Sequence, residues 1–465
     1  MTLARLVGVI VGAIAPALAA AQSAPTDSAA ALGHLRTLIR MNTVNPPGNE
    51  IAVATYLDSV LTAAGIKTWR FTPAPGRAAL VARITGTGAR KPIVLMGHMD
   101  VVGVHREQWV ADPFAAELRG DTLYGRGAID DKGMLVANLM AMLRLKREGD
   151  AGAVLQRDVI FIANSDEEAG GEFGMGWLIA NHPDLIRGEF ALNEGGRTRI
   201  IAGGRRYVAL QGAEKVSHVV TVTARGPDGH ASIPLDGNAI VRLGRALAAI
   251  GTHREPTVLT PTTTRFFGDL ASSWPDRRVG RAMADVSSGV ADRIAAGATV
   301  LRATPVFDAV LRNGISPTIV GGGIRSNVIP ASATATLNVR TLPGESVDAV
   351  VERLRRTVND SLVRIEVTSR GEESPAMPAS GALFDAVRSA ARAIDPAIIV
   401  VPYLSTGATD SARLRVWGMQ AYGLLPFPLA QDDEDRMHGN NERLPLASLT
   451  FGVRFIYEIA ARAAR

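Results

Sequence analysis

The chain has 465 residues, of which 47% are hydrophobic and 20% charged, with a formal net charge of +5. This composition is typical of a globular protein large enough for two domains, and no basic tract with interleaved aromatic residues supports nucleic-acid binding. The chain has no cysteine, which excludes disulfides, zinc–thiolate sites and thiol nucleophiles, so any metal ion must be held by carboxylates and histidines.

The N-terminus has the pattern of an export signal. Arg5 precedes an apolar stretch at residues 6–20, and three alanines at 19–21 suit cleavage. The stretch is short for a membrane span. We expect residues 1–21 to be removed, leaving an exported, periplasmic or secreted protein without a stable membrane span. Retention of the segment as an anchor is the alternative.

The first half of the chain alternates helical patterns with short apolar strands. This alternation predicts a mostly parallel sheet covered by helices. The predicted helices cover residues 30–41, 50–64 and 134–147, and the predicted strands cover 80–84, 93–96, 159–163 and 190–192.

The pattern changes after residue 205, where strands become alternating and β-branched. These strands are expected at 219–224, 333–340 and 363–367, with helices at 239–250 and 347–358. They predict an inserted α+β domain, which residues 255–313 extend as extra helices. The expected organisation is a signal peptide at 1–21, a catalytic domain at 22–211 and 371–465, and the insertion at 212–370.

Polar residues follow the first buried strand directly. The run at 93–96 leads into His98 and Asp100, and ligands of open α/β sheets lie beyond the carboxyl ends of the strands. Asp100 is placed to reach the second ring nitrogen of His98, the usual support of a metal-ligating histidine. Taken alone, this segment equally suits a histidine buried in the core.

Further acids gather at later strand ends. A glycine-rich turn at 125–133 delivers Asp130 and Asp131, and a helix cap would explain only one of them. The strand at 159–163 leads to adjacent acids at 166–168, which repel one another unless they are solvated or share a cation. Glu194 follows a further apolar run, and His438 lies near the C-terminus.

This inventory of two histidines and several carboxylates suits two divalent ions. A shared carboxylate would set the ions about 3.5–4 Å apart. The neighbours Glu167 and Glu168 need not do the same work, because on an irregular loop one can ligate while the other faces a water molecule as general base.

Five segments carry a family resemblance: Gly97-His98-Met99-Asp100, residues 125–133, Asp166-Glu167-Glu168, Asn193-Glu194-Gly195-Gly196 and Met437-His438-Gly439. In this order they resemble the di-zinc aminoacylase/carboxypeptidase metallopeptidase family, which includes glutamate carboxypeptidase, aminoacylase-1 and succinyl-diaminopimelate desuccinylase. The long insertion is most similar to the carboxypeptidase S-like branch. The resemblance implies an α/β zinc-peptidase-like catalytic domain with an inserted ferredoxin-like lid or dimerisation domain.

The resemblance also implies residue roles. One zinc would be bound by His98 and Glu194 and the other by Glu168 and His438. Asp130 would bridge the two ions, often with a cis peptide bond to Asp131. Glu167 would be the general base and Asp100 would orient His98. In the second half of the chain, His230 would stabilise the oxyanion, commonly across a dimer interface, while Asn327, Arg340 and the Gly407 loop would hold the substrate.

The function implied is an exported dinuclear zinc hydrolase that cleaves N-acyl-amino acids or short peptides with a free α-carboxylate. Metal-bound hydroxide generated by Glu167 would attack the amide, and Co²⁺ or Mn²⁺ could replace Zn²⁺. A homodimer through the insertion is expected. The alternatives are a dipeptidase or tripeptidase of the same family, or a periplasmic metal- or solute-binding protein with a relic site, against which the intact Glu167 argues.

Overall fold

A computed structural model describes residues 15–465, with side chains from residue 27. The chain forms two compact units: the part up to Ile186 together with Pro426–Arg465, and Arg187–Leu425. Most of the predicted export signal lies outside the described residues. Helix α1 (Ala15–Arg40) begins earlier than the predicted helix at 30–41 and continues through positions 19–21. Among the described residues, no helix has the length and apolarity needed to cross a membrane.

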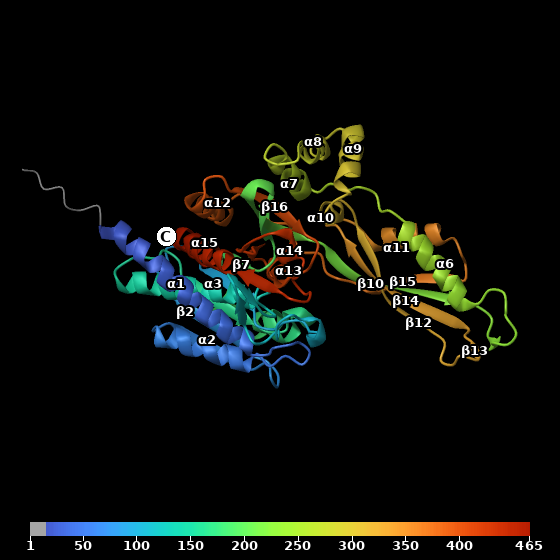
Figure 1. Cartoon of the computed structure of the whole chain (residues 1–465), viewed down its shortest axis with the longest axis horizontal. Coiled ribbons are helices and arrows are strands. Elements are labelled where there is room, and N and C mark those ends of the chain that lie inside the picture. The colour runs from blue at the N-terminus through green and yellow to red at the C-terminus, as the bar shows by residue number, and fades with distance from the viewer. Residues whose placement is uncertain (1–14) are drawn as a thin grey trace, which may run out of the picture. The chain divides into compact units, whose positions relative to one another are not determined.

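The first unit is built on four strands in the order β1 (Lys67–Phe71), β2 (Ala79–Ile84), β6 (Val159–Asn164) and β3 (Ile93–His98). Strands β3 and β6 are parallel, whereas β1, β2 and β6 pair antiparallel. Every residue of β3 and β6 is buried, as expected for strands covered on both faces. The covering helices are visible in Figure 1: α3 (Lys132–Asp150) packs with α1 and α15 (Leu446–Ala464), and α2 (Ile51–Ala63) packs on β1 and β2.

The first unit also contains several shorter elements. A small sheet has the order β19 (Arg443–Pro445), β5 (Thr122–Tyr124) and β4 (Glu117–Arg119). The first unit further contains strand β18 (Pro428–Leu429) and three short helices: α4 (Trp177–Asn181), α5 (Pro183–Ile186) and α14 (Gln431–Glu434).

The second unit contains a sheet with the order β7 (Phe190–Asn193), β17 (Gln420–Gly423), β9 (Arg205–Glu214) and β8 (Arg197–Ile201), and β16 (Ile399–Ser405) lies parallel to β9. The predicted extra helices at 255–313 are α7 (Pro261–Ala271), α8 (Arg277–Val286), α9 (Ala291–Leu301) and α10 (Pro305–Ala309). They pack on this sheet through a shared apolar core. Helices α12 (Ala382–Ile394) and α13 (Asp410–Val416) follow later in the chain.

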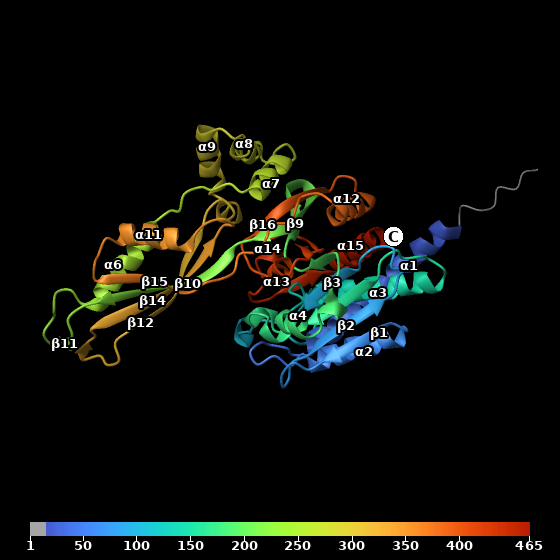
Figure 2. The same cartoon turned by 180° about the vertical axis from the view of Figure 1, so that it is seen from behind.

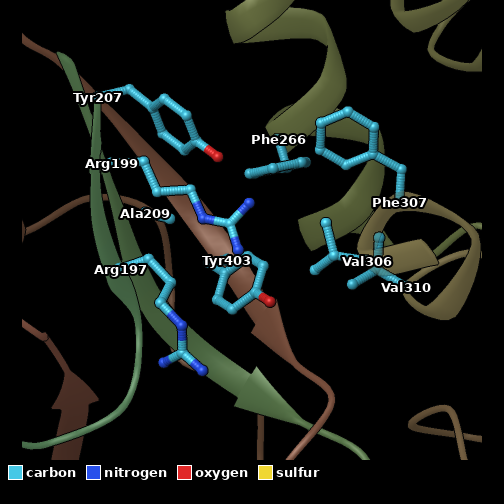
Figure 3. A pocket seen from close by; sticks show the side chains of 9 residues that line it. All are labelled: Arg197, Arg199, Tyr207, Ala209, Phe266, Val306, Phe307, Val310 and Tyr403. Atoms are coloured by element: carbon cyan, nitrogen blue, oxygen red, sulfur yellow. The ribbon is translucent and has the colours of Figure 1, made fainter. Parts of the chain in front are cut away.

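A small hollow lies between this sheet and the helices (Figure 3). Tyr207 and Arg199 project from the strands toward Phe266, and Tyr403 and Arg197 also line the hollow. Its cavity volume is only about 10 Å³. The aromatic rings meet edge to face or tilted, so the helices are joined to the sheet by core packing.

The rest of the second unit is a four-stranded antiparallel sheet, which we call the lid sheet, with the order β12 (Gly314–Gly322), β14 (Ser332–Thr341), β10 (Val216–Arg225) and β15 (Val363–Ser369). Helices α6 (Ala239–Thr252) and α11 (Val347–Val358) cover it (Figure 2). Burial alternates along β10, which confirms the strand predicted from its β-branched alternation. Strand β12, rich in glycine and containing proline, was not predicted. The expected fold class, an α/β protein with an inserted α+β lid, is confirmed.

Candidate metal centre

The site in the first unit begins where β3 ends, at the buried His98. Its Nδ1 lies 2.8 Å from the backbone carbonyl oxygen of Asp100 and 3.5 Å from the Asp100 carboxylate. Its Nε2 lies 3.0 Å from Oδ1 of Asp130. The nearest acceptor for Nδ1 is therefore a carbonyl, and donation to it leaves Nε2 facing Asp130 as the ligand atom.

Asp130 lies between two histidines. It precedes α3 on a turn and is joined to Asp131 by a cis peptide bond. Its Oδ1 faces His98, and its Oδ2 is 2.9 Å from Nε2 of His438, which is also 3.2 Å from Glu168. A carboxylate with one oxygen toward each histidine has the geometry that a bridging ligand requires.

The electrostatics of this cluster favour positive charge. Hydrogen bonds with Asp130 and Glu168 raise the pKa of His438 to about 10. Burial alone would lower the pKa of His98, but its bonds with Asp100 and Asp130 raise it well above the usual value. Burial likewise works against the charged form of Asp130, yet the two histidines hold its pKa below the usual range. The carboxylates of this cluster therefore favour a positive charge held between them.

The donor atoms fit a divalent metal ion. His98, Asp130 and Glu168 each offer one ligand atom, and these atoms lie within 4.8 Å of one another. Imidazole nitrogen and carboxylate oxygen are donors that zinc, cobalt and manganese accept. The structure brings these three predicted residues together, and Nε2 of His438 lies 2.9 Å from Asp130.

The predicted base and its neighbour lie on one turn, η2 (Glu167–Ala169). The amide nitrogens of Glu167 and Glu168 donate to Oδ1 and Oδ2 of Asp100, at 3.2 and 3.1 Å. The Asp100 carboxylate therefore holds this turn as well as lying near the His98 ring, a role that the sequence did not suggest.

Glu442 is a functional residue that the sequence analysis missed. Its fully buried carboxylate accepts hydrogen bonds from the amides of Gly127, Ile129 and Asp130, at 3.0, 2.7 and 3.1 Å. Arg126 pairs with it at 2.6 Å. Burial raises the pKa of Glu442, an effect that Arg126 opposes. The turn that carries Asp130 is thus fixed by a residue more than 300 positions away. The only signal was the Gly-Arg-Gly sequence, which predicts a close backbone approach but no partner.

The other predicted residues belong to the second unit. Glu194 directly follows β7 and is half-buried. Gly407 is exposed on the loop after β16, where its amide donates to Ser405 Oγ at 3.2 Å. An added Cβ at Gly407 would meet only that hydroxyl, at 3.7 Å, so packing within the chain does not demand a glycine there.

His230 and Asn327 lie together at one end of the lid sheet. Strand β11 (Gly229–His230) pairs with β13 (Val328–Ile329), and the amide of Ala231 donates to the carbonyl of Asn327 at 3.0 Å. Both side chains are exposed, and Nδ1 of His230 is 2.7 Å from Ser232 Oγ. The ring therefore has its Nε2 available toward solvent.

Arg340 lies at the opposite end of the lid sheet. It is eight residues beyond Ser332, the first residue of β14, a separation of about 26 Å along a strand. Its Nε donates to Asn338 at 2.9 Å, and its buried Nη1 has no hydrogen-bond partner in the described part of the chain. Burial lowers the pKa of Arg340.

Comparison with known proteins identifies the family. The sequence profile of peptidase family M20/M25/M40 matches residues 94–462. The N-fatty-acyl-amino acid synthase/hydrolase PM20D1 of Xenopus tropicalis is 28% identical over 375 residues, covering 79% of this chain and 72% of the relative. The probable carboxypeptidase S-like 2 of Dictyostelium discoideum is also 28% identical, over 385 residues, with coverage of 79% and 71%.

A solved structure shows the same fold. The M20 family metallo-carboxypeptidase Sso-CP2 of Sulfolobus solfataricus superposes with a TM-score of 0.66 at 17% identity, covering 93% of this chain and 99% of that one. The resemblance to the metallopeptidase family and the hydrolase class are thereby confirmed. The chain belongs to peptidase family M20/M25/M40 and is a metal-dependent hydrolase of amide bonds.

Proposed function

We propose that this hydrolase is an exported enzyme with two zinc ions that cleaves N-acyl-amino acids or short peptides bearing a free α-carboxylate. Arg340 is the observation that carries the substrate class. One of its guanidinium nitrogens is buried without a hydrogen-bond partner among the described residues. Lys215 adds positive charge nearby. The pKa of Lys215 is lowered to about 8, mainly by burial and less strongly by the charge of Arg340. A substrate carboxylate would satisfy this group.

The chain's own residues suit the reaction. His98 and Glu194 would hold one ion and Glu168 and His438 the other, with Asp130 between them. When bound, the ions would supply Lewis acidity and an acidified water molecule. Glu167, held by Asp100 through its amide, would take a proton from that water and pass it to the leaving amine.

His230 would stabilise the oxyanion, from a second subunit. Its strand β11 pairs with β13, which precedes the Ser332 end of β14, and Ser332 is about 26 Å from Arg340 along that strand. One small substrate would therefore not contact both residues of a single chain. Strand β12 offers an edge with exposed Ile319 and Val320, at 64% and 65% exposure. An exposed apolar edge strand favours pairing with a second copy. These features support a homodimer through the lid sheet.

The acyl group is proposed from the relatives. PM20D1 is described as acting on N-fatty-acyl-amino acids, and the present chain shares most of its length. A long acyl chain is therefore the first candidate here. Export rests on the pattern of residues 1–21, and the N-terminal mass of the protein recovered from the periplasm or medium tests it.

The function is tested with zinc-loaded and cobalt-loaded protein on N-acyl-amino acids of increasing acyl length and on dipeptides. Each substrate is paired with its α-carboxamide. We expect hydrolysis of the free acids, much weaker hydrolysis of the carboxamides, and a loss of about 10²–10⁴-fold in kcat for Glu167→Gln. Metal content should stay unchanged in that variant. Full activity of Glu167→Gln, or equal rates on acids and carboxamides, would refute the proposal.

The dimer is tested by mixing two inactive variants. Glu167→Gln protein mixed with His230→Ala protein should regain activity, because hybrid dimers contain one site with both native residues. Subunit exchange is followed with differently tagged chains. Exchange without any regain would show that His230 does not act across subunits.

A further inference from the structure

Besides the bonds from the amides of Glu167 and Glu168, the Asp100 carboxylate accepts a hydrogen bond from Asn45, which is not one of the predicted metal ligands. Nδ2 of Asn45 donates to its Oδ2 at 2.8 Å. Asn45 is 8% exposed, and its own amide donates to the carbonyl of Val101 at 2.9 Å. The segment before α2 is thus fixed beside the end of β3. The side chain of Asn45 reaches the Asp100 carboxylate, which accepts from the amides of Glu167 and Glu168.

The surroundings of Asn45 dictate the orientation of its amide. Besides Asp100, its Nδ2 donates to Oδ1 of Asp166 at 3.2 Å, while its Oδ1 accepts from Nη1 of Arg77 at 3.0 Å. Two carboxylates face the donor side and a guanidinium faces the acceptor side, so only one orientation satisfies all partners. An aspartate at this position would place a third carboxylate against the other two.

Arg77 completes the network from the loop before β2. It is 4% exposed, pairs with Asp166 through Nη2, and donates to the carbonyl of Pro47 at 2.8 Å. Its Nη1 also lies 3.4 Å from the buried Glu50. A planar guanidinium satisfies several such acceptors in fixed geometry, which an ammonium does not.

Asp166 transmits this constraint to the turn. Its φ of 69° is left-handed. Its Oδ2 accepts the amide of Phe173 at 3.0 Å, and its carbonyl accepts the amide of Gly171 at 2.6 Å. The segment 166–173 is therefore held near its start by hydrogen bonds to Asp100. Asp166 joins the two ends of the segment through its bonds with Gly171 and Phe173.

We propose that Asn45 and Arg77 are positioning residues: through Asp100 and Asp166 they fix the turn that places Glu167 and Glu168. The inference rests on the proposed roles of Glu167 and Glu168. Its chemical consequence is separable from substrate binding, because displacement of the turn moves a base and a metal ligand, whereas the carboxylate-binding residues lie elsewhere.

The test uses two variants. Asn45→Asp preserves the shape of the side chain and replaces its donating NH₂ group with an accepting oxygen. Arg77→Lys preserves the charge and replaces the planar guanidinium with an ammonium. Each is measured for kcat, KM, unfolding midpoint and Co²⁺ affinity by competition with a chelator, with the Co²⁺ absorption spectrum recorded. For Asn45→Asp we expect kcat to fall about 100-fold, as for a misplacement near 1 Å. Co²⁺ affinity should fall about 10–100-fold. KM should stay within about threefold, because the substrate contacts are unchanged. Arg77→Lys should show smaller changes of the same kind.

Arg157→Met is the matched control. Arg157 is 3% exposed and donates to the carbonyl of Lys91 at 2.6 Å, before the start of β6 and away from the metal centre. It should lower the unfolding midpoint while kcat, Co²⁺ affinity and spectrum stay at wild-type values. Folded Asn45→Asp and Arg77→Lys proteins with wild-type kcat and Co²⁺ affinity would overturn the inference. If the wild type hydrolyses nothing but the variants still lose Co²⁺ affinity, the proposed function fails and the positioning role stands.

Discussion

The metal centre of the first unit and the lid sheet of the second are prepared for chemistry to different degrees. In the first unit, every predicted metal ligand has a side-chain partner in the cluster around Asp130. Glu442 fixes the backbone that carries Asp130. On the lid sheet, His230 and Asn327 are exposed and Arg340 keeps one nitrogen without a partner among the described residues. Preorganisation is thus greatest around the metal centre, where charge must be held, whereas polar groups of these lid residues are exposed or lack a partner among the described residues.

The largest effect that sharpens this comparison is expected at Glu442. Glu442→Gln leaves Arg126 as a buried cation without its counter-charge, which should cost about 3–5 kcal/mol of unfolding free energy. Chemical denaturation measures it. Asp348→Asn in the second unit is the control, because Asp348 pairs with Arg370 at the surface and its loss should hardly move the midpoint. Similar losses for both variants would contradict the buried role.

His230→Ala should show the reverse combination. Removing one oxyanion donor is expected to lower kcat about 10²–10³-fold, whereas the unfolding midpoint should not change because the side chain is exposed. Ser232→Ala, which removes only the Nδ1 partner of His230, is the milder control. An unchanged kcat in His230→Ala would place the histidine outside the reaction.

Glu50 gives the first unit a pH-dependent stability. Burial raises its pKa to about 7 from the model-compound value of 4.5. The native state therefore binds a proton that the unfolded chain has released between these values, so stability falls as pH rises from about 4.5 to 7. Glu50→Gln should remove up to about 3 kcal/mol of this fall. Urea unfolding at pH 5 and pH 8 measures it, and parallel pH profiles for variant and wild type would contradict it.

The smallest of these effects is expected at Arg340. Loss of a charged hydrogen bond of about 2 kcal/mol should raise KM for free-acid substrates about 30-fold in Arg340→Met. The carboxamide substrates lack the charge, and their KM should change little. Lys215→Met serves as the comparison, because its Nζ donates to the carbonyl of Arg312 and should alter KM less. Equal KM changes for acids and carboxamides would remove Arg340 from the carboxylate site.

Polar residues at the ends of strands could be predicted from the sequence. The residues that hold them through hydrogen bonds from distant parts of the chain could not. His98, Asp130 and Glu168 were predicted together because each follows a buried apolar strand or a glycine turn. No local pattern reveals that Glu442 caps the turn before Asp130, because the two are 312 residues apart. Asn45 and Arg77 were missed for the same reason: an Asn-Pro-Pro-Gly segment predicts a turn, and its side-chain partners depend on tertiary packing.

The lid sheet shows the same limit in its strands. Strand β10 was predicted from alternating β-branched residues, but β12 contains Pro317 and several glycines and has little strand propensity of its own. Its pairing with β14 supplies what propensity does not. Likewise, the sequence placed both His230 and Arg340 in the insertion. The strand register shows that Arg340 lies near the end of β14, whereas His230 belongs to the separate pair of β11 and β13.

The position of Glu442 near the C-terminus has a consequence for biosynthesis. Until that segment has been made, Arg126 and the amides around Asp130 lack the carboxylate that satisfies them. A nascent chain that stops before Glu442 therefore lacks the partner of this turn, and one that stops before His438 also lacks this proposed ligand. If the chain is exported unfolded, as proposed, the centre would be completed only after Glu442 had crossed the membrane. The supply of metal in the destination compartment would then decide which ion the enzyme receives.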